Sequence, residues 1–157
     1  MNILFIGDIV GKLGRNVTGY MIEKITSSRP IDFIIANGEN VTHGKGINEE
    51  HLKELLECGI DVVTLGNHYA AKKEIFNFID QYDCLLRPNN LHESIPGTGT
   101  NIFDCNGVKI RVTNLLGKAF MNGVIENPFD NIHSLIMFYL PPKAFQLRLL
   151  LLLSMLL

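Results

Sequence analysis

The sequence has few of the features that mark secreted, membrane-spanning or nucleic-acid-binding proteins. It has no cluster of lysines and arginines, and its net charge is −2, which argues against an extended surface for nucleic-acid phosphates. Its three cysteines are odd in number and form no CxxC pair. Residues 1–6 already read as an apolar strand, where a secretory leader would begin with basic residues. These absences predict a reduced, cytoplasmic protein.

The end of the chain has no acidic residues and no hydrophobic run of membrane-spanning length. The apolar stretch 149–157, with Ser154 inside it, is too short to span a bilayer, so no transmembrane segment is expected. Residues 131–157 contain no Asp or Glu. The chain of 157 residues is long enough for one domain and too short for two full-sized ones.

Short apolar runs recur at the spacing of a strand-helix unit. Residues 3–6, 31–36 and 60–65 are continuous rather than alternating, which is typical of parallel strands covered on both faces. A weaker fourth strand is predicted over residues 84–86. These runs predict an α/β fold built on a parallel sheet.

The segments between the strands predict helices. One includes residues 17–25 and ends before Pro30, and a second begins after the cap Asn48 and ends at Gly59. A third is predicted over residues 70–82. Its inward side chains would be Ile75, Phe76, Phe78 and Ile79.

Two other segments have glycine-dependent turns. The loop 7–15 has three glycines, but its spacing fits neither the dinucleotide fingerprint nor the P-loop, so we interpret it as a metal-binding turn. Residues 101–104 and 108–113 flank Asn106-Gly107, which predicts a hairpin with an Asn-Gly turn.

Polar side chains follow three of the predicted strands. Asp8, Glu39 and Asn67 recur at intervals of 31 and 28 residues. If each loop closes one parallel strand, all three meet at one edge of the sheet, where open α/β sheets bind ligands. Each residue alone would more often be a helix cap or turn residue, but three successive strand ends favour a shared site.

The chemistry of these side chains suits divalent cations. Asp8, Glu39, Asn40 and Asn67 offer hard oxygen ligands, and a carboxylate that bridges two cations suits a two-metal hydrolase site. His68 follows Asn67 directly and could donate a proton to a leaving alkoxide. A structural role for His68 is the alternative.

Three blocks of the sequence resemble a known family. Residues 5–11, 37–40 and 65–68 look like the first three metal-binding blocks of the calcineurin-like metallophosphoesterases, and more narrowly of their YmdB-like branch. That branch is similar to 2′,3′-cyclic-nucleotide phosphodiesterases. Supporting matches lie in residues 43–46, 72–76, 87–90 and 127–129.

The resemblance implies a fold and a role for each residue. The fold would be the N-terminal half of a layered α/β/β/α domain. Asp8 would bind one metal ion, Glu39 would bridge, Asn40 and Asn67 would lie toward the second ion, and His68 would lie near the scissile phosphate. The implied cofactors are two divalent ions, iron or manganese, with zinc as a third possibility, and the implied substrate is a small nucleotide or phosphodiester.

The chain departs from the family pattern in two places. Tyr69-Ala70 stands where the family has a Thr-Trp pair, and the three histidines of the family's second half have no counterpart. We therefore expect an incomplete domain over residues 1–133 and an atypical leucine-rich tail over residues 134–157. One hypothesis is that the tail is read in a shifted frame, which predicts a family-like continuation in another frame of the genomic locus.

Three functions stay open at this point. The first is a binuclear metal-dependent phosphodiesterase. The second is an inactive fragment of such an enzyme, with weak metal binding. The third is an interaction module that forms a homo-oligomer through the leucine tail.

Overall fold

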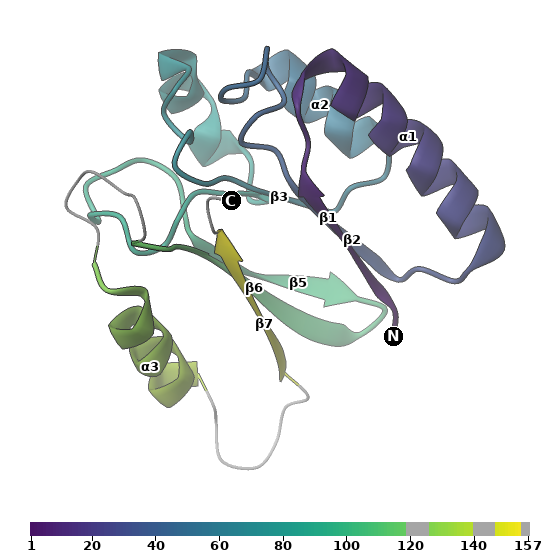
Figure 1. Cartoon of the computed structure of the whole chain (residues 1–157). Helices are drawn as coiled ribbons and strands as arrows, with labels where there is room; N and C mark the ends of the chain where they lie inside the picture. Colours follow the sequence, from purple (N-terminus) through teal and green to yellow (C-terminus); the bar gives the residue numbers. More distant parts are fainter. Residues whose placement is uncertain (119–125, 140–146, 155–157) are drawn as a thin grey trace.

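Two β-sheets pack face to face in the computed structural model, which describes residues 1–118, 126–139 and 147–154 (Figure 1). Helices α1 and α2 lie on the other side of the first sheet. The elements are, in chain order, β1 (Ile3–Asp8), α1 (Gly11–Ser28), β2 (Phe33–Asn37), α2 (Glu49–Glu57), β3 (Val62–Thr64), the 3-10 helices η1 (Lys73–Asn77) and η2 (Ile79–Gln81), β4 (Leu85–Leu86), β5 (Thr100–Cys105), β6 (Val108–Leu116), α3 (Pro128–Tyr139) and β7 (Leu147–Ser154).

The first sheet, sheet A, has the strand order β1-β2-β3-β4, with every pair parallel. This confirms the predicted α/β fold with a parallel sheet. The register between β1 and β2 shifts between Ile6 and Asp8, so that Asp8 pairs with Asn37. The carboxyl ends of neighbouring strands therefore meet at one edge of the sheet.

Strand β2 shows why its sequence is apolar without alternation. Ile34 and Ala36 belong to the core on the helical side, which includes Leu52 and Leu55 of α2. Phe33 and Ile35 belong to the core between the two sheets, which is completed by Cys105, Ile110 and Val112 of the second sheet. Successive side chains of a strand point to opposite faces, so both faces of β2 are covered.

The second sheet, sheet B, is built on the predicted hairpin. Strands β5 and β6 are antiparallel and pair Cys105 with Val108 across the turn. Asn106 and Gly107 have φ values of 53° and 82°, the left-handed region that an Asn-Gly turn needs. Strand β7 pairs in parallel with β6, so part of the predicted leucine-rich tail is a strand. Residues 140–146 and 155–157 of that tail lie outside the described residues.

Three predictions about these elements were wrong. Strand β1 is not covered on both faces, since Phe5 is 49% exposed. It also lies at the edge of sheet A. Helix α1 begins at Gly11, inside the predicted loop 7–15, where the Gly11 N–H donates to the Asn40 carbonyl at 3.0 Å. The predicted helix 70–82 is instead the pair η1 and η2.

The break between η1 and η2 has a local cause. Phe78 separates them with a φ of −133°, outside the helical region. The segment is rich in isoleucine and phenylalanine, which are only moderate helix formers. Ile75, Phe78 and Ile79 are buried as predicted, but Phe76 is 40% exposed.

Across residues 1–118, 126–139 and 147–154, none of the helices combines the length and the hydropathy that crossing a bilayer requires.

Candidate functional site

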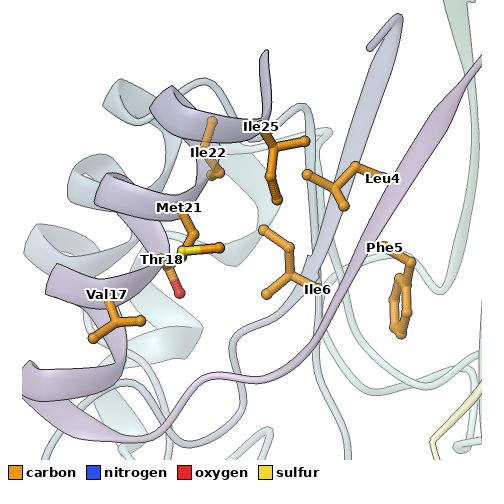
Figure 2. Close-up of a pocket in the computed structure, with 8 residues that line it drawn as sticks. All are labelled: Leu4, Phe5, Ile6, Val17, Thr18, Met21, Ile22 and Ile25. Atoms are coloured by element: carbon orange, nitrogen blue, oxygen red, sulfur yellow. The ribbon is translucent and has the colours of Figure 1, made fainter. Parts of the chain in front are cut away.

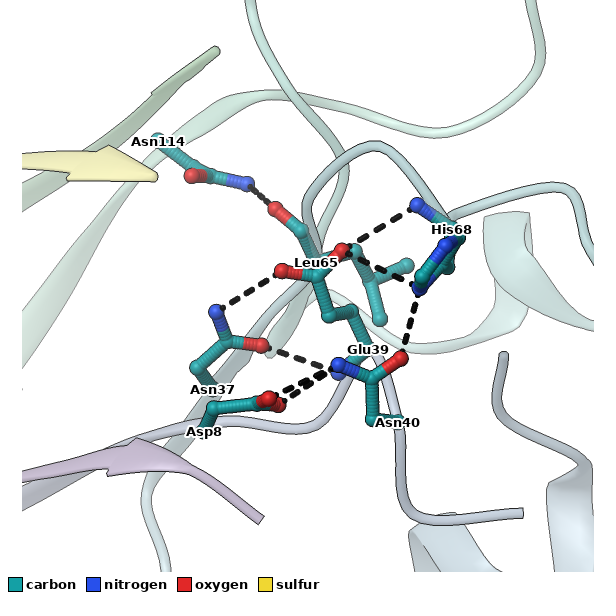
Figure 3. A network of polar contacts seen from close by, with 7 residues as sticks. All are labelled: Asp8, Asn37, Glu39, Asn40, Leu65, His68 and Asn114. Atoms are coloured by element: carbon teal, nitrogen blue, oxygen red, sulfur yellow. Dashed lines mark hydrogen bonds and ion pairs between the residues drawn. The ribbon is translucent and has the colours of Figure 1, made fainter. Parts of the chain in front are cut away.

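Four of the predicted site residues gather where the first three parallel strands end, namely Asp8, Glu39, Asn40 and His68 (Figure 3). Asp8 is the last residue of β1 and Asn37 is the last residue of β2. Strand β3 ends at Thr64, and the turn that contains His68 follows at residues 67–70. Parallel strands thus place residues far apart in the sequence at one edge of sheet A.

A hydrogen-bonded chain links three of the predicted residues. Asn40 Nδ2 donates to Asp8 Oδ1 at 2.9 Å and to Asp8 Oδ2 at 2.8 Å. His68 Nδ1 lies 2.6 Å from Asn40 Oδ1. Because an amide oxygen can only accept, Nδ1 of His68 carries the shared proton. The other ring nitrogen, Nε2, is then the one able to exchange a proton with a ligand.

Glu39 lies beside this chain with its carboxylate buried, and the residue is 8% exposed. Oε1 accepts from Asn37 Nδ2 at 3.2 Å, and Oε2 accepts from the backbone N–H of His68 at 3.1 Å. His68 Nδ1 is 3.9 Å from Oε2. Among the residues that the structure describes, no lysine or arginine forms an ion pair with Glu39. A buried carboxylate is costly without a compensating charge, which favours a cation at this position.

Gly66 makes room for that carboxylate. A Cβ added at Gly66 would overlap both carboxylate oxygens of Glu39. Gly66 does not have a left-handed backbone, so its role is space rather than conformational freedom. The sequence motif that contains Gly66, Asn67 and His68 therefore includes a steric requirement that its polar residues do not reveal.

Asn67 takes no part in the hydrogen bonds described above for these groups. It lies between Gly66 and His68 and is half-buried. No hydrogen bond joins its side chain to another residue in the described ranges. Tyr69, the departure from the family pattern, packs against the core on the helical side.

The loop after Glu39 is fixed by a residue that the sequence did not single out. Arg15 of α1 is 8% exposed; its Nε is 2.6 Å from Glu54 Oε2 of α2, and its guanidinium donates to the Val41 carbonyl at 2.5 Å. One cation thus ties α1, α2 and the site loop together. The sequence analysis missed this role because it placed Arg15 in the loop 7–15 and not in a helix.

Sheet B also supports the site. Asn114 of β6 is fully buried, and its amide donates to the Leu65 carbonyl at 2.5 Å and to the Leu86 carbonyl at 3.0 Å. Leu65 directly follows β3 and Leu86 is the last residue of β4, and Figure 3 shows the bond to Leu65. Asn114 stands where the alternation of Val108, Ile110 and Val112 calls for an apolar side chain, and this is the signal that could have identified it.

The donors at this edge fit divalent cations only in part. Asp8 and Glu39 are carboxylates, and Asn40 and Asn67 add amide oxygens, which hard divalent ions accept. Asn40 Oδ1 is engaged by His68. In the described part of the chain, no group of three or more His, Cys, Asp or Glu side chains is arranged to hold a metal ion. The residues present therefore offer oxygen donors from Asp8, Glu39, Asn40 and Asn67, but only part of a ligand set for such an ion.

Comparison with known proteins identifies the family. The family model described as YmdB-like protein matches residues 4–147. The chain is 42% identical over 136 residues to a 2′,3′-cyclic-nucleotide 2′-phosphodiesterase of Bacillus subtilis, covering 87% of this chain and 51% of that protein. It is 37% identical over 143 residues to a putative phosphatase/phosphodiesterase of Mycoplasma genitalium, covering 87% of this chain and 50% of the relative.

Two solved structures share the fold. A crystal structure of a phosphatase from Mycoplasma pneumoniae matches with a TM-score of 0.84 and 32% identity, over 98% of this chain and 55% of the other. A hypothetical protein from Thermus thermophilus matches with a TM-score of 0.82 and 28% identity, over 99% of this chain and 59% of the other. The chain spans about half the length of the curated relatives it matches. On its sequence match and its fold, the chain belongs to the YmdB-like protein family.

Proposed function

We propose that this chain forms the Asp8 and Glu39 side of a binuclear metal centre in a phosphodiesterase, with 2′,3′-cyclic nucleotides as the substrate class. The observation that carries the proposal is the buried Glu39 carboxylate, which has no lysine or arginine partner in the described residues. The substrate class comes from the name of the Bacillus subtilis relative, a 2′,3′-cyclic-nucleotide 2′-phosphodiesterase.

The proposed reaction is hydrolysis of a phosphodiester. Divalent cations, when bound at this edge, would supply positive charge for the phosphate oxygens and favour attack by water. Asp8 and Glu39 would hold the cations, with amide oxygens from Asn40 and Asn67. The buried setting of Glu39 keeps its charge poorly screened by water, which strengthens its attraction for a cation.

His68 is the proposed proton donor to the leaving ribose oxygen. Its Nδ1 proton is held by Asn40, whose amide is in turn fixed by Asp8. This bonding orients the ring. In the doubly protonated imidazolium, Nε2 would carry the proton that passes to the departing alkoxide, which leaves His68 neutral with its proton on Nδ1. The chain Asp8-Asn40-His68 thereby couples the position of the acid to the position of a proposed metal ligand.

A second candidate is a fragment of such an enzyme without activity of its own. It is favoured by the lack of three clustered His, Cys, Asp or Glu side chains in the described residues, since transition metals prefer several protein ligands. Under this candidate the purified chain binds metal weakly and turns over little substrate.

One experiment separates the two candidates. The purified chain is assayed with a 2′,3′-cyclic nucleotide and added manganese or iron, and its metal content is measured by elemental analysis. Turnover that Glu39→Gln abolishes supports the enzyme, because this change removes the charge and keeps the shape. Absent turnover with less than one ion per chain supports the fragment. Two ions per chain would contradict an incomplete site.

A further inference from the structure

A groove lined mainly by apolar side chains runs between β1 and α1 (Figure 2), and one of its two hollows is also lined by Lys24, Ser28 and Arg29. Two hollows of about 240 and 450 Å³ form it, and both are lined by Leu4, Met21 and Ile25. In Figure 2, Leu4 points toward α1, whereas Phe5 points to the opposite face of the sheet. Apolar side chains thus border the edge of β1 on both faces.

The exposure of these side chains is high for their size. Phe5 is 49% exposed, Val17 is 50% exposed and Met21 is 39% exposed. Val17 and Met21 are contiguous, because they are one helical turn apart and line the groove beside β1, whereas Phe5 points to the opposite face of the sheet. A contiguous apolar patch of this kind marks an interaction site more often than isolated exposed side chains do.

The backbone of β1 is also open along this edge. Sheet A begins with β1, and no strand within the described residues pairs with its outer side. The Asn2 carbonyl accepts from the Asp32 N–H toward β2, so the alternate residues Ile3 and Phe5 direct their backbone groups outward. Between Ile3 and Gly7 the strand has no charge and no proline to block pairing.

We infer that the β1 edge and its groove are the docking surface for a polypeptide equivalent to the half of its relatives that this chain does not match. The alignment leaves about half of the Bacillus subtilis and Mycoplasma genitalium relatives uncovered. The M. pneumoniae structure matches 98% of this chain with only 55% of its own. That additional polypeptide needs a surface of the matched half to pack on.

Sequence composition supports the same occupant. The continuous apolar run of residues 3–6 is the pattern of a strand covered on both faces, yet the structure leaves β1 partly uncovered. A partner must therefore add a strand to the edge and also cover apolar side chains on both sides of it. This inference rests on the geometry of β1 and α1, and it is independent of the proposed catalytic function.

The test is co-expression of the full chain, carrying an affinity tag, with the part of the Bacillus subtilis relative that the alignment leaves uncovered. We expect a 1:1 complex by size-exclusion chromatography with light scattering. Val17→Glu combined with Met21→Glu should lower the captured partner at least tenfold. Tyr20→Glu is the matched control, since Tyr20 is 62% exposed on the same helix and does not line the groove.

Hydrogen exchange adds a readout that does not depend on variants. The Phe5 amide should exchange rapidly in the chain alone and slowly in the complex if a strand pairs with β1. No complex, an unprotected Phe5 amide, or an equal loss of capture with Tyr20→Glu would each overturn the inference. Self-association of the chain that Val17→Glu abolishes, without capture of the added polypeptide, would instead identify a second copy as the occupant and overturn it too.

Discussion

Single residues at the site have requirements that their chemistry alone does not reveal. Glu39 needs the space left by Gly66, and His68 needs the amide of Asn40 in one orientation. The residue types of the site could be predicted from three strand ends. The space at Gly66 and the bonds between the side chains could not, because they depend on how the strands pack.

Gly66→Ala provides a prediction at this scale. The added methyl group would overlap the Glu39 carboxylate and displace it, which we expect to lower the free energy of unfolding by about 1–3 kcal/mol. Chemical denaturation measures this effect. Gly7→Ala is the control, since a Cβ at Gly7 meets no atom within 4 Å. Equal stability of the two variants would contradict the steric role of Gly66.

At the scale of elements, helix α2 and the site loop are joined through one cluster. Thr42 Oγ1 is 2.8 Å from His51 Nδ1, and it accepts from the Asn48 N–H at 3.0 Å. The side chain of Asn48 caps α2 by accepting from the His51 N–H at 2.9 Å. The sequence predicted the Asn48 cap, because caps depend on local chemistry. It did not predict the contacts of Thr42, which depend on the loop's conformation.

This cluster predicts a dependence of stability on pH. Burial lowers the pKa of His51, and the positive charge of Arg15 lowers it further. His51 therefore binds a proton less readily in the folded chain than in the unfolded chain. Stability should be fully present above the ordinary pKa of 6.5 and should decline as the pH falls from there through the lowered pKa.

Denaturant titrations between pH 7.5 and pH 5 test this dependence. His51→Gln keeps a polar side chain without a charge, so its decline in stability over this pH range should be smaller than that of the unchanged chain. His92→Gln is the control, because His92 is exposed and bonds only Ser94 among the described residues. Parallel pH profiles for His51→Gln and the unchanged chain would contradict the assignment.

At the scale of the whole molecule, the sequence predicted the fold class and most elements, but it did not predict which strand lies at an exposed edge or where a helix is broken. Parallel strands, the hairpin and the α/β class follow from periodic apolar residues and turn chemistry, which act locally. The exposed edge of β1 was missed because an apolar run shows that a strand suits burial, not that something covers it. The break at Phe78 was missed because helix propensity is a weak guide, and tertiary packing can override it.

Binding of divalent ions should stabilise the whole fold if the site is as proposed. A tenfold excess of free manganese over its Kd would stabilise the chain by about 1.4 kcal/mol and raise Tm by roughly 3–6 °C. Differential scanning fluorimetry measures the shift, and a chelator should reverse it. Glu39→Gln should show no shift. A shift of equal size in Glu39→Gln would place the bound ion elsewhere.

The bond from Asn114 to the Leu65 carbonyl also bears on how the chain matures during synthesis. The two residues are 49 positions apart. At about 5–20 residues per second, a ribosome needs roughly 2–10 s to make that interval. For those seconds the end of β3 has been synthesised while the side chain that holds it has not. The nascent site is therefore open to solvent and to chaperones for longer than a small helical hairpin needs to fold.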